Sequence, residues 1–283
     1  MTVKSILPLL CCPVCRGELS ASLLCAGCGE RFRVEKDVYR LVSTKVSELD
    51  ACWDESDWPE EYDPAKEQDK DENGKVYSDY LNEETRKARD LWSDKFKERL
   101  GMLSGNVMDI ATGQGGAMRS LLESKGDFLP IATDMCAGVM VYARSLLREK
   151  YGLTRGFAAV ATDIRHLALK DGVIDAAVTL AGLQEIKGTA EVSAEIHRVM
   201  KPGGRLLALV ALFDKDSASA RRAEGFGGLR GVINELLIED LEAAGFKNVR
   251  IDIVSQAVLA ANPRDRTPVA GDIMYYGILE AFV

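Results

Sequence analysis

Residues 107–116 constrain the fold of this chain more than any other stretch. A short apolar run that ends at Ile110 leads into the glycine-rich turn Thr112-Gly-Gln-Gly-Gly116, and a helix-like segment follows at once. A strand, a glycine turn and a helix in this order bring backbone N–H groups close to a nucleotide-like ligand. Asp109 stands near the end of the expected strand, so its carboxylate should face the same ligand.

A second acid follows about twenty residues after the glycines. The apolar run 128–133 ends in Asp134. In nucleoside-binding folds, an acid at the tip of the second strand holds ribose hydroxyls. The two patterns together predict a nucleoside-binding α/β domain.

Apolar runs and helical stretches alternate beyond residue 105, which implies parallel strands with helices on both faces of a sheet. The last two strands lack a convincing helix between them, so one of them can run antiparallel. We expect a Rossmann-like sheet of seven strands, mostly parallel, with one antiparallel strand near its edge. The expected strands are 106–110, 128–133, 156–162, 174–180, 204–213, 248–254 and 273–282. The expected helices are 78–100, 116–125, 137–150, 189–201 and 231–244, with Ser78 as the cap of the first.

The composition is that of a globular protein. The chain has 283 residues, of which 47% are hydrophobic and 28% charged, enough for one or two domains with a full core. Its apolar stretches are all shorter than the ~18 residues that span a membrane. The first residues run into a cysteine cluster without a small-residue cleavage site, so we expect a cytoplasmic protein without a membrane partner.

Two C-x-x-C pairs stand near the N-terminus, with nine residues between them. Each pair fits a tight turn that presents two thiolates, and two such turns complete a tetrahedral zinc site. The predicted ligands are Cys12, Cys15, Cys25 and Cys28. Two disulfides are the alternative, which the missing signal peptide disfavours. Cys11 breaks the spacing and is either a spare thiol or a substitute for Cys12.

Residues 31–42 alternate apolar and charged side chains around a turn at Lys36-Asp37, which predicts short strands packed on the zinc knuckle. Residues 1–47 therefore predict a small zinc ribbon. The segment resembles the small zinc-ribbon proteins that activate methyltransferases. It is also similar to the ribbon of some ribosomal-RNA guanine methyltransferases, although their last ligand is commonly a histidine. The first resemblance implies a protein partner for the ribbon, and the second implies RNA.

Charge divides the chain unevenly. Residues 1–47 carry seven Lys or Arg against four acids, whereas residues 48–75 carry twelve acids against three lysines. The acidic stretch predicts a linker over 48–77, and Trp53, Trp58 and Tyr62 suggest that it packs on a neighbouring domain. The alternative is a lid over a binding site.

Residues 78–283 resemble the class I S-adenosylmethionine-dependent methyltransferases, because several motifs follow one another in the family's order. The glycine turn matches the first motif, Asp134 the ribose-holding acid, and Ala161-Thr-Asp163-Ile164 the motif whose acid pairs with the adenine amine. The stretch Lys201-Pro-Gly-Gly resembles the turn that opens the fifth strand. The resemblance implies that S-adenosylmethionine is bound by Asp109, Ala111, Gly113, Gly115, Asp134, Met135, Asp163, Ile164 and Ala181.

The same resemblance implies methyl transfer to an O, N or C atom of a small organic acceptor. The family's Asn/Asp-Pro-Pro-Tyr signature for nucleic-acid bases is absent, and residues 76–283 carry no long basic run for a phosphate backbone. RNA remains the alternative acceptor, and a non-catalytic scaffold that binds the cofactor remains the alternative to an enzyme. Glu185 and His166 are the candidates for a general base, which is needed only if the acceptor must lose a proton.

Overall fold

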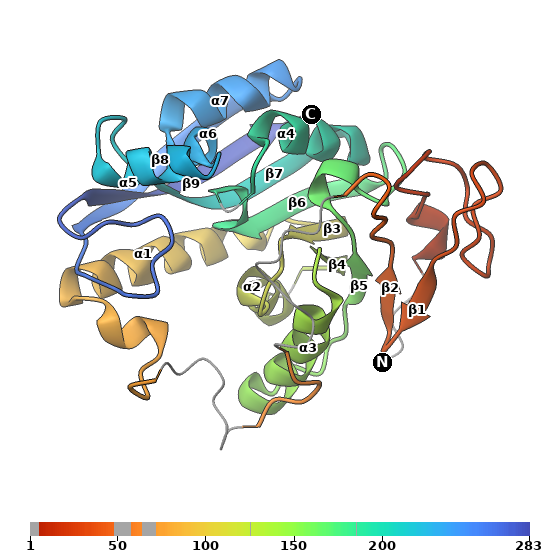
Figure 1. Cartoon of the computed structure of the whole chain (residues 1–283), viewed down its shortest axis with the longest axis horizontal. Helices are drawn as coiled ribbons and strands as arrows, with labels where there is room; N and C mark the ends of the chain where they lie inside the picture. The colour runs from red at the N-terminus through yellow and green to blue at the C-terminus, as the bar shows by residue number, and fades with distance from the viewer. Residues whose placement is uncertain (1–5, 48–57, 64–71, 125, 185) are drawn as a thin grey trace.

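A single mixed sheet organises the chain, and its strands come from the N-terminal ribbon as well as from the domain that follows. The computed structural model describes residues 6–47, 58–63, 72–124, 126–184 and 186–283 (Figure 1). The strands are β1 Arg33–Glu35, β2 Val38–Arg40, β3 Gly105–Ile110, β4 Phe128–Asp134, β5 Ala158–Ala161, β6 Ile174–Leu180, β7 Met200–Leu212, β8 Lys247–Val258 and β9 Ile273–Phe282. They are ordered β1-β2-β5-β4-β3-β6-β7-β9-β8 across the sheet.

Helices cover both faces of this sheet. The longer helices are α1 Glu83–Leu100, α2 Gly116–Glu123, α3 Ala137–Tyr151, α4 Thr189–Val199 and α7 Asn234–Ala243, with the shorter α5 Ala218–Gly225 and α6 Leu229–Val232. Within the described ranges the 3₁₀ helices are η1 Leu7–Leu9, η4 Tyr77–Tyr80, η5 Ile164–His166 and η6 Gly182–Gln184. Helices α1, α2 and α3 lie on one face and α4 and α7 on the other (Figure 1). None of the helices in the described ranges is both long and apolar enough to cross a membrane.

The prediction of seven strands is wrong by two, because the ribbon hairpin extends the sheet. Strands β3 to β9 form the expected arrangement, with β9 antiparallel to both of its neighbours. The hairpin β1–β2 adds two more strands: β2 runs parallel to β5, with Val38 opposite Ala159 and Arg40 opposite Ala161. An exposed sheet edge carries unpaired N–H and C=O groups, and the hairpin supplies their partners along β5.

Further contacts bind the ribbon to this edge. Leu10 forms an antiparallel bridge with Leu169. The backbone N–H of Cys11 donates to the carbonyl of Ala168 at 3.1 Å, and the N–H of Lys170 donates to that of Leu9 at 2.8 Å. Residues 6–47 therefore share backbone hydrogen bonds with the rest of the chain, and the division into a ribbon, a linker and a domain stays a prediction.

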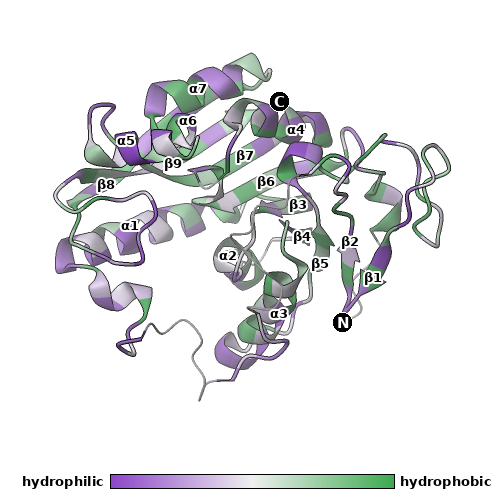
Figure 2. Ribbon diagram, viewed as in Figure 1, coloured by the Kyte–Doolittle hydropathy of each residue, from purple (hydrophilic) through white to green (hydrophobic). Residues whose placement is uncertain are grey.

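The core has one layer on each face of the sheet, because successive side chains of a strand point to opposite sides. In β3, Val107 packs with α1, α2 and α3, whereas Met108 packs with the layer that includes α4 and α7. The middle strands are mainly hydrophobic, while the outer helices mix hydrophobic and hydrophilic residues (Figure 2). This pattern matches a sheet that is buried on both faces.

Several local boundaries differ from the sequence prediction. Helix α1 begins after Asn82, whose side chain accepts a hydrogen bond from the N–H of Thr85, so Ser78 is not its cap. Ser78 lies instead in η4. Residues 214–230, to which the sequence assigned neither helix nor strand, contain α5 and the start of α6.

Part of the acidic stretch packs against α3. The ring of Trp58 lies 5.4 Å from that of Tyr142, and the N–H of Tyr62 donates to the hydroxyl of Ser145 at 3.0 Å. Glu60 pairs with Lys36 of the ribbon turn at 2.6 Å. Trp53 lies outside the described residues, so the choice between a linker and a lid stays open.

Candidate functional site

The predicted cofactor residues gather at one edge of the sheet. Strands β3, β4, β5 and β6 are parallel, so their carboxyl ends meet at the same edge. In open α/β sheets, ligands bind in the crevice at this edge. Within or directly after these four strands stand Asp109, Ala111, Gly113, Gly115, Asp134, Met135, Asp163, Ile164 and Ala181.

The glycine turn exposes main chain toward this edge because side chains do not fit. Gly115 has a φ of 88°, in the left-handed region that favours glycine. A Cβ atom there would lie 3.1 Å from the Cδ1 of Leu147 in α3. Helix α2 begins at the next residue, so its free N–H groups follow the turn directly.

Asp109 is the most unusual group at this edge. Its side chain is 1% exposed, and neither carboxylate oxygen has a hydrogen-bond partner in the described part of the chain. Burial raises the pKa of Asp109 to about 8, against the opposing effect of the nearby Thr112 hydroxyl and Met118 N–H, neither of which reaches hydrogen-bond geometry, and the charge of Asp134 adds to the rise. Buried carboxylates are normally hydrogen-bonded, so an orphaned one indicates a missing partner. A cationic donor would satisfy it.

Asp134 connects the glycine turn to β4. Its Oδ2 accepts from the N–H of Gly113 at 2.9 Å, and its Oδ1 accepts from the N–H of Cys136 at 2.9 Å. Burial raises the pKa of Asp134 above its usual value, and these N–H donors oppose that shift. The side chain is half-buried at the end of β4, where the sequence predicted it.

The exits of β3 and β6 lie side by side. Ala111 and Ala181 have φ values of 49° and 59°, a left-handed conformation that is uncommon for alanine. A Cβ atom on Gly182 would lie 2.9 Å from the Cβ of Ala111, so only glycine permits this approach. Strained backbone of this kind clusters at ligand sites.

Asp163 already has partners, unlike Asp109. It is 1% exposed, and its oxygens accept from the Nε of Arg165 at 3.0 Å and from the NH2 of Arg165 at 2.8 Å. Burial raises the pKa of Asp163, but the hydrogen bonds and charge of Arg165 outweigh it and bring the pKa below its usual value. An adenine amine would have to share this carboxylate with Arg165, so the adenine role of Asp163 stays a prediction.

The structure leaves the two candidate bases unassigned. His166 ends η5 and is half-buried three residues after Asp163. Glu185 lies outside the described residues. The neighbouring Gln184 has a structural role, because its side-chain oxygen accepts from the N–H of Ala211 in β7 at 2.9 Å.

A second polar group at the same edge was not predicted. The hydroxyl of Tyr77 donates to Asp265 at 2.8 Å, and burial raises the pKa of both side chains. Nearby, the fully buried hydroxyl of Tyr276 has no partner in the described ranges, and burial raises its pKa to about 12. Tyr276 pairs with Ala211 near the carboxyl end of β7. Tyr77 is far in sequence from Asp265 and Tyr276, so no local sequence pattern could have indicated this group.

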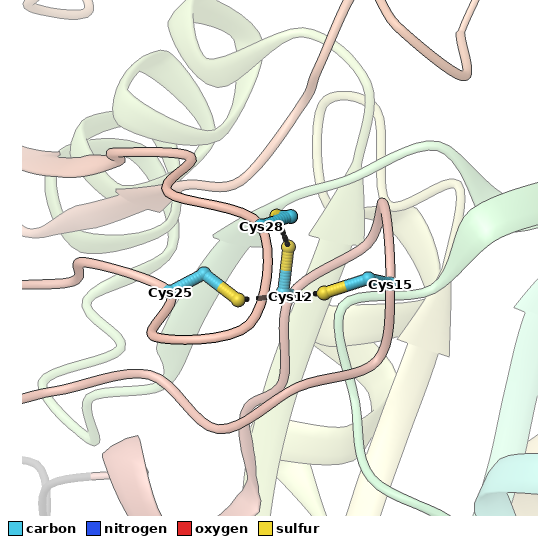
Figure 3. A group of neighbouring side chains, drawn as sticks. All are labelled: Cys12, Cys15, Cys25 and Cys28. Carbon is cyan, nitrogen blue, oxygen red and sulfur yellow. Dashed lines mark hydrogen bonds between the residues drawn. The ribbon is translucent and has the colours of Figure 1, made fainter.

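The four predicted ligand cysteines form one cluster (Figure 3). Their sulfur atoms all lie within 4.8 Å of one another, with 3.6 Å between Cys12 and Cys28 and 3.4 Å between Cys15 and Cys25. Cys11 is buried outside the cluster, where burial raises the pKa of its thiol. The cluster could hold a metal ion, and it uses Cys12 rather than Cys11.

The knuckle around this cluster also contacts α4. A Cβ atom on Gly17 would lie 3.1 Å from the sulfur of Cys25, so glycine is required beside the thiols. The preceding Arg16 has a φ of 60° and pairs with Glu195 of α4 at 2.7 Å. Arg198 pairs with the same carboxylate at 2.8 Å. A cysteine turn and helix α4 are thus joined through the buried carboxylate of Glu195, which pairs with the half-exposed Arg16 and with Arg198.

Comparison with known proteins gives partial matches along the chain. Residues 108–208 match the family model described as "Methyltransferase domain". The Ubiquinone/menaquinone biosynthesis C-methyltransferase UbiE of Pseudomonas paraeruginosa is 33% identical over 133 residues, which are 46% of this chain and 50% of that protein. The demethylmenaquinone methyltransferase of Corynebacterium kroppenstedtii is 35% identical over 117 residues, 41% of this chain and 46% of that protein. The chain spans about half the length of these curated relatives.

A solved structure of phosphoethanolamine N-methyltransferase 2 from Haemonchus contortus, in complex with S-adenosyl-L-methionine, has a TM-score of 0.50. It is 16% identical and covers 67% of this chain and 51% of that one. At this identity the likeness concerns the fold alone. The chain therefore has an α/β methyltransferase fold with a mostly parallel mixed sheet, and residues 108–208 are similar in sequence to methyltransferase domains.

Proposed function

We propose that the protein is an S-adenosylmethionine-dependent methyltransferase that acts on an O, N or C atom of a small organic acceptor. The observation that carries the proposal is the buried, unpartnered carboxylate of Asp109 beside a bare glycine turn. The methyltransferase domain match over residues 108–208 supports the same reaction.

The residues at the sheet edge suit this cofactor. S-adenosylmethionine supplies an activated methyl group on a cationic sulfonium. Asp109 would accept hydrogen bonds from the ammonium of its methionine part, because a charged donor is what the orphaned carboxylate lacks. Asp134 would bind the ribose hydroxyls, since it lies beside Gly113 at the end of β4. The chain would thus orient the cofactor, and good alignment with an acceptor can lower the barrier by several kcal/mol.

A small-molecule acceptor is favoured by the curated relatives, whose names describe methyltransferases of ubiquinone and menaquinone biosynthesis. The acceptor would bind near the carboxyl ends of β6 and β7, where Tyr77, Asp265 and Tyr276 add polar groups to an apolar layer. Glu185 and His166 stay the proposed bases for an acceptor that loses a proton. RNA and a protein partner of the ribbon are the alternatives.

We also propose that the four cysteines bind a structural zinc ion. Tetrahedral zinc with bonds of about 2.3 Å places its sulfur ligands roughly 3.8 Å apart. The measured separations of 3.6 Å and 3.4 Å are close to this spacing. Elemental analysis should find one zinc per chain, lost in Cys28→Ser and retained in Cys11→Ser. Zinc retained in both variants would contradict the assignment.

Calorimetry with S-adenosylhomocysteine tests the cofactor, and transfer from labelled S-adenosylmethionine tests the reaction. We expect binding at one site per chain and label in a small-molecule fraction of cell metabolites. Label in total RNA instead would favour the RNA alternative. Binding without any transfer would favour the scaffold, and no binding would refute the proposal.

A further inference from the structure

A cleft of about 240 Å³ lies between the ribbon and the carboxyl ends of β4 and β5. The ribbon supplies most of its lining, and the sheet supplies Met135 and Ala161. Met135 directly follows Asp134, so the cleft borders the proposed cofactor site without including its carboxylates. The resemblance to methyltransferases assigns Met135 to the cofactor, but neither it nor the matched domain over residues 108–208 assigns a ligand to the arginines on the ribbon side of the cleft.

Three arginines, Arg31, Arg33 and Arg40, are among the residues that line this cleft. The side chain of Arg31 is exposed and forms no hydrogen bond or ion pair within the described residues. Arg33 and Arg40 both contact the same oxygen of Glu35, each at 3.0 Å. Arg31 is therefore the arginine of this lining whose side chain is available to a ligand.

The acid in the lining does not neutralise these arginines. Glu30 pairs with Lys45 and accepts from the hydroxyl of Ser43 at 3.3 Å. Hydrogen bonds from Lys45 hold the pKa of Glu30 below its usual value, so Glu30 stays paired with that lysine at neutral pH. The remaining lining combines the apolar Phe32, Val42, Met135 and Ala161 with Thr44.

We propose that this cleft binds the phosphate group of a small molecule. Guanidinium groups match the geometry of phosphate oxygens and bind them through paired hydrogen bonds. A phosphate monoester carries close to two negative charges at neutral pH, which suits a cleft where cations outnumber acids. The apolar side of the cleft would contact the organic part of the ligand. The volume is slightly below the range of about 300–1,000 Å³ that holds drug-sized ligands, so the ligand is small.

Calorimetry on the 283-residue chain, purified in the presence of zinc, tests the site with two probes, inorganic phosphate and phenyl phosphate. We expect one site per chain, and binding that weakens about tenfold or more in Arg31→Ala, since a hydrogen bond to a charged group is lost. Arg31→Lys should weaken binding less, because the charge remains and only the paired geometry is lost. Tighter binding of phenyl phosphate indicates a phosphorylated metabolite, whereas equal binding of both probes indicates free phosphate, and either supports the site.

The control is Arg148→Ala, an exposed arginine paired with Glu149 near the other end of α3, about 18 Å along the helix from its start. It should leave phosphate binding unchanged. Three outcomes would overturn the proposal: no binding of either probe, equal weakening by both alanine variants, or displacement of phosphate by saturating S-adenosylhomocysteine. Binding of a short RNA that depends on Arg31, without binding of either small probe, would also overturn it.

Discussion

Replacing Asp109 with asparagine should stabilise the protein and weaken its binding of S-adenosylhomocysteine. Asparagine has nearly the same shape as aspartate but cannot ionise. The folded protein holds the pKa of Asp109 at about 8, whereas an aspartate in an unfolded chain has a pKa of about 3.9. The wild-type chain must therefore retain a proton, or bury a charge, in order to fold at neutral pH.

The size of the stabilisation follows from this difference. A pH of 7 is about three units above the pKa of Asp109 in the unfolded chain and still below its pKa in the folded protein. Each unit between the unfolded pKa and the pH corresponds to about 1.36 kcal/mol of unfolding free energy. Ionisable Asp109 then costs the fold about 4 kcal/mol, an order-of-magnitude figure. Because the folded pKa is the higher one, this cost is absent below about pH 4, grows as the pH rises, and is constant above about pH 8.

The effect on binding has the opposite sign. If Asp109 accepts hydrogen bonds from the cofactor's ammonium, losing the charge removes about 1.5–3 kcal/mol, which is roughly a tenfold to 150-fold increase in Kd. Binding must also ionise Asp109, so the wild-type affinity should rise with pH up to about 8 and the asparagine variant should lack this dependence.

Urea unfolding between pH 5 and 9 and calorimetry with S-adenosylhomocysteine measure both effects. The matched control is Asp175→Asn, since Asp175 lies near the amino end of β6 and pairs with Lys201 at 2.7 Å, away from the proposed site. It should lower stability slightly and leave binding unchanged. An asparagine variant of Asp109 that is less stable at every pH, with cofactor affinity intact, would refute the reasoning.

Three further predictions concern the supports of the site. Glu195→Gln should lower the free energy of unfolding by about 2 kcal/mol, since it removes the charge that accepts hydrogen bonds from Arg198 and from the half-exposed Arg16; an unchanged urea midpoint would show that the network is dispensable. Gly115→Ala should cost about 1–2 kcal/mol from its left-handed φ of 88° and weaken S-adenosylhomocysteine binding in calorimetry. Removing the proposed zinc ion with a chelator should accelerate hydrogen exchange in β5 as well as in residues 6–47, and exchange that changes in residues 6–47 alone would contradict the shared sheet.

The sequence was sufficient where the signals were local. Alternating apolar runs located β3 to β9 within a few residues, and the glycine turn identified the edge at which Asp109 and Asp134 lie. The spacing of the cysteines identified the cluster of four thiols. Each of these predictions depends on residues that are close together in the sequence. There, the hydrophobic period and the spacing of turn residues and cysteines directly determine the local structure.

The sequence was insufficient where distant segments meet. The alternation over residues 31–42 predicted short strands where β1 and β2 lie, but the pairing of Val38 with Ala159 depends on tertiary structure. Asp163 and Arg165 are only two residues apart, but their ion pair was not predicted, because the family resemblance assigned Asp163 to the adenine amine. The hydrogen bond from Tyr77 to Asp265 joins two segments that are far apart in the sequence.

The parallel pairing of β2 with β5 has a consequence for synthesis of the protein. About 120 residues separate the two strands, and at roughly 5–20 residues per second the ribosome needs on the order of 6–24 s to translate them. During that interval β2 lacks the strand that pairs with it in the folded protein. The backbone N–H and C=O groups along β2 that later pair with β5 are therefore unpaired in the nascent chain. A chaperone or a second nascent chain could bind them until residues 158–161 emerge from the ribosome.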